Sequence, residues 1–396
     1  MSPTRRCPWL LALVLAGCGG QPAPPATRPH VVDATPTVYA SERLRYSVTE
    51  QVAGLVHPWS LAFLPEGGML VTERPGRLRR IGADGTVSAP IEGLPAVFVD
   101  GQAGLFDVAL SPGFAVDHLV YFSYAEANWR GNLAGAAVAR GRLQGNRLDD
   151  VQVIFRQLPK RSAGTNLGTR LVFDRKGHLF IGLGDGRVAA EEAQQLDSLQ
   201  GKLVRIRPDG SVPPDNPFVG KAGARAEIWS YGHRNIQGAA LDPRTGQLWT
   251  SEHGPMGGDE LNIPQAGRNY GWPVITYGLG YDGQPVPGSV GASAPGMEQP
   301  LHYWKKSPAL SGLAFYTGRA FEPWQGNLFL GALAGTALIR LELDGNRVVH
   351  EERLLADRGQ RIRDVRQGPD GALYLLVDAD DGKLLRLAPV APQSAK

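Results

Sequence analysis

One hairpin pattern recurs six times along the chain and constrains its fold more than any other feature. Each copy has a short apolar segment, a turn with Pro, Asp or Gly, and a second apolar segment. Such pairs are typical of β-hairpins, because the turn residues supply the backbone angles that a chain reversal needs. The first segments begin at Leu61, Val108, Leu171, Ala239, Leu313 and Val365, and the second at Met69, Leu119, Leu179, Leu248, Leu328 and Leu373.

The spacing of these copies favours a β-propeller. They lie about 50 to 70 residues apart, and further strands are expected at 77–81, 203–207 and 337–343. Three or four strands per copy suit one propeller blade each. A plain β-sandwich would not repeat one hairpin six times, and solenoid repeats are shorter. We therefore predict an all-β, six-bladed β-propeller over residues 46–390, with long inter-strand loop inserts and functional residues gathered at the channel mouth.

The first residues have the features of an export signal. Two arginines precede the apolar run 9–16, which is too short to span a bilayer as a helix. The run leads into Leu-Ala-Gly-Cys, which resembles the lipobox of a bacterial lipoprotein signal. We predict cleavage of residues 1–17 and lipidation of Cys18, with residues 18–45 as a flexible Pro- and Ala-rich tether. An ordinary secretory signal with an incidental cysteine is the alternative.

Charge and cysteine content limit the environment and the partners. The predicted anchor implies a periplasm-facing lipoprotein of the bacterial cell envelope, and Gly19 after the lipidated cysteine favours the outer membrane. Both cysteines, Cys7 and Cys18, lie in this N-terminal segment, so we expect no internal disulfide. Loss of residues 1–17 removes two of the 41 basic residues and none of the 38 acidic ones. The near-neutral balance argues against a nucleic-acid partner, which would require a clustered basic excess.

The stretch 228–273 is dense in glycine and polar residues between apolar strands. Gly254 and Pro255 follow a predicted strand, and Asp259 and Glu260 add carboxylates close by. Glycine and proline after a strand can expose backbone carbonyls, which are oxygen ligands of the kind that Ca²⁺ takes. The sequence therefore indicates a candidate calcium site in this stretch.

Several runs, in the same order, resemble motifs of the soluble pyrroloquinoline quinone (PQQ) sugar dehydrogenases, the glucose/sorbosone and aldose sugar dehydrogenases. These runs are GQAGL at 101–105, the segment 193–218 and the block 231–273, and the resemblance extends over nearly the whole exported chain. It implies PQQ over the channel mouth and a Ca²⁺ ion that polarises the quinone as a Lewis acid. It also implies oxidation of aldose sugars to lactones, with hydride passing from sugar C1 to PQQ and electrons passing to an external acceptor.

The resemblance also implies roles for single residues. Gly254 and Pro255 would hold the cofactor's Ca²⁺, Glu260 and Tyr270 would ligate a second, structural Ca²⁺, and Arg234 would lie beside the sugar and the quinone. The residues implied to bind the cofactor are Gln102, Asp185, Asn235, Arg361 and Arg363. The two arginines of this set suit the PQQ carboxylates, because guanidinium groups bind carboxylates bidentately.

Each assignment has a structural alternative. Asp185, in Gly-Asp-Gly, could be only a turn residue, and Arg361 and Arg363 could form an exposed basic stripe. Likewise, Gly254-Pro255 could be only a loop, Gln102 and Glu260 could be solvated, and Tyr270 could be a core aromatic. His233 and His253 are expected to be hydrogen-bonded structural histidines, because no second histidine lies at helical metal-ligand spacing.

The position of the general base departs from the family pattern. The family histidine that removes the sugar proton lies in a segment resembling NHFGGRLVFD, and here residues 165–174 read TNLGTRLVFD. Asn166 therefore stands at the catalytic base position. An amide has no usable basicity at neutral pH, and loss of a positioned base typically costs about 100- to 10,000-fold in rate. Asp185 could replace the base through water, or His233 or His253 could approach from a neighbouring loop.

Functions of three classes follow from these residues. The leading interpretation is a PQQ- and Ca²⁺-dependent sugar oxidoreductase, although Ala334 stands where some members of the family have a lysine near the cofactor. Asn166 supports the alternative of a non-catalytic PQQ- or sugar-binding envelope propeller. A Ca²⁺-dependent lactone or ester hydrolase is the third, since the fold hosts many functions, but a Gly-Pro pair with an arginine pair favours a quinone. A nicotinamide enzyme is disfavoured, because residues 182–186 do not fit GxGxxG.

Overall fold

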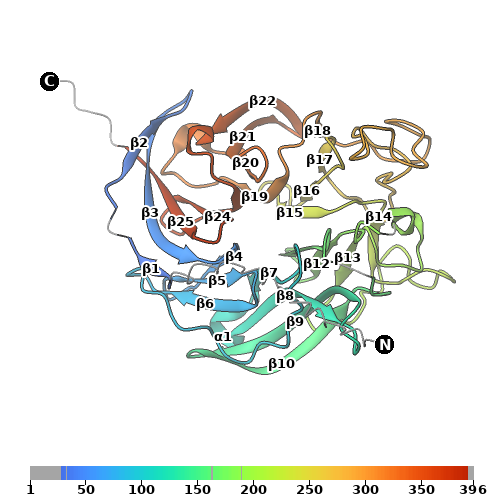
Figure 1. Ribbon diagram of the computed structural model, residues 1–396, viewed down its shortest axis with the longest axis horizontal. Coiled ribbons are helices and arrows are strands. Elements are labelled where there is room, and N and C mark those ends of the chain that lie inside the picture. Colours follow the sequence, from blue (N-terminus) through green and yellow to red (C-terminus); the bar gives the residue numbers. More distant parts are fainter. Residues whose placement is uncertain (1–27, 33, 162–163, 189, 391–396) are drawn as a thin grey trace, which may run out of the picture.

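Six small antiparallel sheets surround a central axis and form a six-bladed β-propeller (Figure 1). The computed structural model describes residues 28–32, 34–161, 164–188 and 190–390. Within them, helical structure is limited to α1 (Phe114–Asp117) and the short 3-10 segments η1 (Ala190–Gln194), η2 (Glu322–Trp324) and η3 (Ala356–Arg358). The predicted all-β propeller is therefore confirmed. No helix of the described ranges is long and apolar enough to cross a membrane.

Every blade starts with the strand nearest the axis and continues outward. Blade one has β4 (Pro58–Phe63), β5 (Met69–Glu73) and β6 (Arg77–Ile81), and blade two has β7 (Leu105–Leu110), β8 (Leu119–Ala127), β9 (Ala134–Gln144) and β10 (Arg147–Arg156). Blade three has β11 (Gly168–Phe173), β12 (Leu179–Leu183), β13 (Lys202–Ile206) and β14 (Ile228–Tyr231). Blade four has β15 (Ile236–Leu241), β16 (Leu248–Glu252), β17 (Asp259–Asn262) and β18 (His302–Trp304). Blade five has β19 (Leu310–Phe315), β20 (Leu328–Ala332), β21 (Ala337–Asp344) and β22 (Arg347–Leu354).

The six predicted hairpins are the first two strands of the six blades. Leu61 pairs with Val71 in blade one, for example, and Leu313 pairs with Leu330 in blade five. The second strands β5, β12, β16 and β20 are buried at every position. Blades pack face to face, so both faces of these strands are covered, and β12 and β20 are continuous runs of apolar residues and glycine instead of alternating ones.

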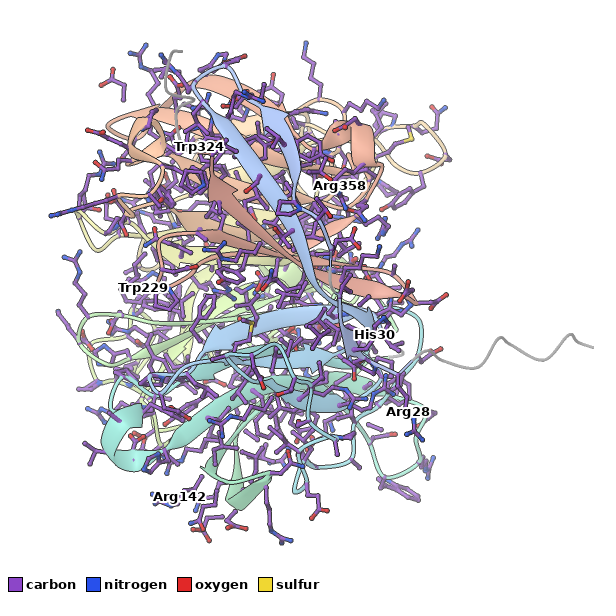
Figure 2. The ribbon with its side chains drawn as sticks, turned by 90° about the vertical axis from the view of Figure 1, so that its left-hand side faces the viewer. Arg28, His30, Arg142, Trp229, Trp324 and Arg358 are labelled. Carbon is purple, nitrogen blue, oxygen red and sulfur yellow. The ribbon has the colours of Figure 1, made fainter. Side chains whose placement is uncertain are left out.

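Blade six joins the two ends of the chain and closes the ring. It consists of β23 (Ile362–Gln367), β24 (Leu373–Val377), β25 (Gly382–Pro389) and the N-terminal β3 (Arg45–Leu55), which pairs with β25. Two further strands, β1 (His30–Val31) and β2 (Thr37–Ala40), pair with β3. Arg358 of η3 donates to the Tyr39 hydroxyl on β2 and to Glu50 on β3, and it lies beside these strands in Figure 2.

The predicted tether boundary at residue 45 is therefore too late. Residues 30–31 and 37–40 are paired strands, because β3 offers them a free edge opposite β25 and Tyr39 stacks on Tyr46 at 5.8 Å. The sheet thus begins before Tyr46, where the sequence analysis placed its start. The predicted signal peptide and Cys18 lie outside the described residues.

A buried ionic cluster fills the channel below its mouth. Arg170 Nη1 lies 3.2 Å from both Asp107 Oδ1 and Asp364 Oδ1, and these three side chains come from blades three, two and six. The Arg170 guanidinium also lies over the Trp59 ring, 4.3 Å from its centroid. The inner strands of three blades are thereby linked, and Trp59 is held above the cluster.

Candidate functional site

The predicted site residues converge at one end of the channel because of strand direction. The first two strands of each blade are antiparallel, so the start of the first and the end of the second lie at the same edge. The connections before first strands contribute Gln102, Asn166 and Asn235. The connections after second strands contribute Asp185 and Gly254. Residues far apart in the sequence therefore meet at the mouth of the channel.

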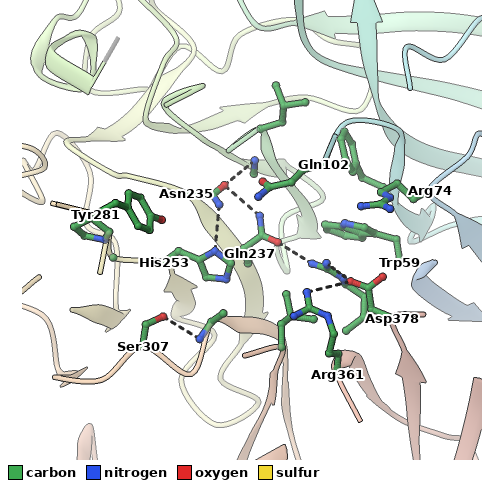
Figure 3. A pocket seen from close by; sticks show the side chains of 18 residues that line it. Trp59, Arg74, Gln102, Asn235, Gln237, His253, Tyr281, Ser307, Arg361 and Asp378 are labelled. Carbon is green, nitrogen blue, oxygen red and sulfur yellow. Dashed lines mark hydrogen bonds and ion pairs between the residues drawn. The ribbon is translucent and has the colours of Figure 1, made fainter. Parts of the chain in front are cut away.

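A cavity of about 250 Å³ opens at this end and takes its lining from all six blades (Figure 3). Its charged side chains are three arginines, Arg74, Arg361 and Arg363, and one aspartate, Asp378. Trp59, which rests on Arg170, also lines the cavity. Of the predicted site residues, those in the lining are Gln102, Asn235, Gly254, Pro255, Arg361 and Arg363.

Asp378 orients the arginine pair. Arg363 Nη2 donates to Asp378 Oδ2 at 2.7 Å, and the Nη2 of Arg361 lies 3.6 Å from the same oxygen. His57 Nδ1 donates to the other oxygen, Oδ1, at 2.7 Å. Burial opposes ionisation of Asp378, but the charge of Arg363 and the bond from His57 outweigh it and hold the pKa of Asp378 well below its ordinary value. Asp378 is therefore an anion that fixes Arg363 against the cavity.

Asn166 and Asp185 are hydrogen-bonded to each other beside the cavity but are not part of its lining. Asn166 Nδ2 donates to Asp185 Oδ1 at 3.0 Å, and Trp272 Nε1 donates to Oδ2 at 2.9 Å. The backbone N–H of Arg187 also donates to Oδ1, which is the bond of a turn-forming aspartate. Both oxygens of Asp185 are thus occupied by donors, and Asp185 fixes the amide of Asn166.

The two histidines of the stretch 228–273 have different surroundings. His233 is fully buried, with Ser230 on one ring nitrogen and Glu252 on the other. His253 lines the cavity. Its Nε2 donates to the Leu310 carbonyl, so Nδ1 is the acceptor nitrogen, and this atom lies 3.4 Å from Asn235 Nδ2. Burial lowers the pKa of His253, which leaves a neutral ring at the cavity wall.

Arg234 lies between the cavity and a second, smaller void. Its Nη1 donates to the Gly254 carbonyl at 2.6 Å, and its Nη2 donates to the Tyr281 hydroxyl at 3.3 Å. Its Nε is buried and has no hydrogen-bond partner among the described residues. Arg234 therefore connects the Gly254-Pro255 loop with Tyr281, which lines the cavity and is 60% exposed.

The smaller void measures about 10 Å³ and is lined by Glu252, Glu260 and Tyr270. Burial, followed by the charge of Glu252, raises the pKa of Glu260 to about 8. Asn262 Nδ2 donates to both carboxylates, at 3.1 Å and 3.2 Å. No group of three or more His, Cys, Asp or Glu side chains in the described ranges could hold a metal ion. A cation here would therefore need backbone or other oxygens in addition to these acids.

The sequence matches the family described as Glucose / Sorbosone dehydrogenase over residues 55–386. The chain belongs to this family. The aldose sugar dehydrogenase YliI of Escherichia coli is 52% identical over 338 residues, which cover 85% of this chain and 91% of that protein. The resemblance that the motifs of the sequence indicated is thereby confirmed.

Solved structures of the family share the fold. The soluble aldose sugar dehydrogenase from Escherichia coli in its apo-form superposes with a TM-score of 0.85 at 50% identity, covering 87% of this chain and 100% of that one. The PQQ-bound aldose sugar dehydrogenase from Streptomyces coelicolor superposes with a TM-score of 0.71 at 29% identity, covering 92% and 99%. The architecture of the propeller is thus common to relatives at very different identities.

Four cavity residues absent from the predicted site share one position in the repeat. Arg74, His253, Leu333 and Asp378 each come directly after the second strand of a blade, at the ends of β5, β16, β20 and β24. The sequence therefore contained a signal for them, namely the residue that follows the second apolar segment of each hairpin. Trp59, Gln237 and Tyr281 belong to no such position, and only the assembled ring places them in the lining.

Proposed function

We propose that this protein oxidises aldose sugars to lactones with PQQ and Ca²⁺, and passes the electrons to an external acceptor. The observation that carries the proposal is one cavity that holds both the Arg361–Arg363 pair and the Gly254-Pro255 loop. When bound, PQQ would accept the hydride, and Ca²⁺ would act as a Lewis acid that polarises the quinone. Membership of the sugar dehydrogenase family and the PQQ-bound relative from Streptomyces coelicolor support this reading. The predicted lipid anchor would place the reaction at the periplasmic face of a membrane.

The residues of the cavity suit such a cofactor. Arg361 and Arg363 offer guanidinium groups to its carboxylates, with geometry that favours bidentate bonds. Gly254 and Pro255 offer backbone carbonyls, which are hard oxygen ligands for Ca²⁺. Gln102 and Asn235, two of the three amides of the lining, can donate or accept hydrogen bonds beside the ring.

A second Ca²⁺ is proposed at the small void beside Glu260 and Tyr270. Burial, followed by the charge of Glu252, raises the pKa of Glu260, and a divalent cation between the two carboxylates would offset the cost of ionising both. A void of about one water-sized sphere can hold a single small ion or water. The role of this ion would be structural, because it would tie β16 to β17 and to the loop of Tyr270.

Asn166 supports a second candidate function, a propeller that binds PQQ or sugar without turnover. The Nδ2 of Asn166 is committed to Asp185, and an amide cannot accept the proton of the sugar hydroxyl. Asp185 is itself surrounded by donors. Sugar oxidation therefore needs a proton acceptor other than Asn166.

The deciding experiment compares the protein lacking residues 1–27 with its Asn166→His variant. The backbone suits this change, because Asn166 has φ 49° and histidine is among the residues that tolerate this region. We would measure PQQ binding by quenching of tryptophan fluorescence, and glucose oxidation by dye reduction with PQQ and Ca²⁺. We expect the parent to bind PQQ and to reduce dye.

Three other outcomes are informative. Equal rates for the two proteins would mean that another group takes the proton. Turnover by the variant alone, with PQQ bound by both, would favour the binding propeller. Failure of both proteins to bind PQQ would overturn the proposed function.

A further inference from the structure

Arg74 is an arginine of the cavity wall whose side chain has no partner among the described residues. It follows β5 in blade one, and its side chain lies beside Trp59 in the lining (Figure 3). Its guanidinium makes no hydrogen bond or ion pair with any described residue. A guanidinium with free donors at the wall of a cavity is a good anion site, because its charge is screened less there than on an open surface.

The arginines near Arg74 differ from it, because each of them has a carboxylate partner. Arg77 and Arg79, on β6, both donate to the buried carboxylate of Glu73, at 2.7 Å and 2.6 Å. Arg363, which also lines the cavity, donates to Asp378. The protein therefore neutralises the arginines around Arg74 with carboxylates and leaves Arg74 without one.

The backbone holds Arg74 firmly between two blades. Its N–H donates to the His57 carbonyl at 3.0 Å, and its own carbonyl accepts from the Leu105 N–H at 2.9 Å. A Cβ on Gly104 would lie only 2.6 Å from Cγ of Arg74, so the stem of the side chain occupies space that only a glycine leaves free. The position of the charge is thus set by blades one and two together.

Among the described residues, the opposite wall of the cavity has no charged side chain in its lining that could bind an anion. Ser307, Ala309 and Leu333 line it, and the next residue is Ala334, where the family resemblance implies a lysine in some members. The cations of the lining are therefore limited to Arg74, Arg361 and Arg363, and Asp378 offsets one of them.

We propose that Arg74 is an anion-binding residue that takes a carboxylate of PQQ, in a chain whose opposite wall lacks a cation. The inference rests on the proposed function and deepens it. The shared chemistry is a carboxylate, which the cofactor or an acidic sugar could supply. We assign it to the cofactor, because Arg74 lies on the same cavity as the arginine pair that suits the other PQQ carboxylates.

The test measures the Kd of PQQ by fluorescence quenching for the parent, Arg74→Gln and Arg74→Lys. We expect Arg74→Gln to raise the Kd about tenfold or more, since a hydrogen bond to a charged group contributes on this scale. Arg74→Lys should lie between the two, because it keeps the charge and loses the bidentate geometry. The increase should shrink at high salt, as expected for a charge contact.

The matched control is Arg207→Gln. Arg207 is exposed, follows β13 at the opposite end of the propeller and has no side-chain partner among the described residues, so its loss changes net charge equally. The KM values for glucose and glucuronate, measured on the same proteins, separate the two sources of carboxylate. Unchanged melting temperatures would show that the variants are folded.

The outcomes separate this inference from the proposed function. If the parent does not bind PQQ, the proposed function is overturned, and the role of Arg74 with it. If the parent binds PQQ and Arg74→Gln binds it equally well, only the role of Arg74 is wrong. An unchanged Kd with a raised KM for glucuronate alone would move Arg74 to the substrate and would overturn its assignment to the cofactor.

Discussion

At the scale of single residues, Glu260 links the chemistry of the site to the stability of blade four. Its carboxyl group shares a small void with Glu252, and burial together with that neighbour raises its pKa to about 8. Ionisation of two neighbouring carboxyl groups away from solvent is unfavourable unless a proton or a cation lies between them. The proposed structural Ca²⁺ would supply that cation.

Removal of one carboxylate should therefore abolish a calcium effect without unfolding the protein. We expect the melting temperature of the parent to rise with Ca²⁺ concentration, because an ion that binds only the folded state stabilises it. Glu260→Gln should match or exceed the parent in EDTA at neutral pH, because folding raises the pKa of the Glu260 carboxyl to about 8, which costs stability there, and an amide carries no such cost. It should gain little from Ca²⁺. Differential scanning fluorimetry across a Ca²⁺ series measures both effects.

The control for this prediction is Glu66→Gln. It removes a carboxylate from the exposed turn between β4 and β5 in blade one, away from the void in blade four. It should respond to Ca²⁺ as the parent does. A parent melting temperature that is independent of Ca²⁺, or a full response in Glu260→Gln, would remove the second calcium site from the proposal.

The sequence predicted only part of the candidate site, and the reason differs between residues. Gln102, Asn235 and the Gly254-Pro255 loop are within family motifs, and the structure places all of them in one cavity. Arg74 and Asp378 follow the second apolar segment of their hairpins, but their roles were missed, because each role depends on the groups that surround the side chain. Lack of a partner for one, and bonds from His57 and Arg363 for the other, are properties of the assembled ring.

At the scale of elements, the inner strands approach one another too closely for ordinary side chains at certain positions. Gly238 on β15 is one of these, since a Cβ there would collide with the Ser311 carbonyl oxygen and with the side chains of Ser251 and Leu313. Ser311 and Leu313 lie on β19, the inner strand of the next blade. The missing side chain thus lets blades four and five meet at the axis.

Gly238→Ala should lower the free energy of unfolding by about 1–3 kcal/mol, the usual cost of overpacking a filled core. A lower urea midpoint with an unchanged m-value would measure it. The same change in a Ser251→Ala background is the control. The cost should persist there, because the Ser311 carbonyl is backbone and cannot move aside. Full recovery in that background would mean that the serine side chain, and not the neighbouring strand, sets the constraint.

The hairpins could be predicted from the sequence because both of their strands and their turn are local. The predicted strand at 203–207 differs from β13 by one residue at each end, for example. The strands β1 and β2 were assigned to a tether instead, since their partner β3 was itself not recognised as part of blade six. The pairing of β3 with β25 joins residues more than 300 positions apart, and no local pattern encodes such a contact.

At the scale of the whole molecule, the ring depends on β3 because blade six would otherwise end at β25. Tyr46, Val48, Val52 and Leu55 on β3 are all buried. Tyr46 and Val48 belong to the core cluster that includes Trp324 and Phe329 of blade five. The N-terminal strand therefore packs against the last two blades of the chain as well as pairing with β25.

Deletion of residues 1–55 should abolish cooperative folding, whereas deletion of residues 1–27 should leave the melting temperature unchanged. Four buried apolar side chains contribute about 1.5–3 kcal/mol each, which together matches the whole stability of a typical domain. The unpaired edge of β25 would also favour aggregation.

PQQ binding should be lost in the protein lacking residues 1–55, although every lining residue is retained. The cavity needs blade one and blade six side by side, as the His57–Asp378 bond across the seam shows, and an open ring would not hold them so. Near-ultraviolet circular dichroism, size-exclusion chromatography and quenching by PQQ measure these effects. A cooperative melt near the parental temperature for residues 56–390 would mean that the inner strands alone hold the ring closed.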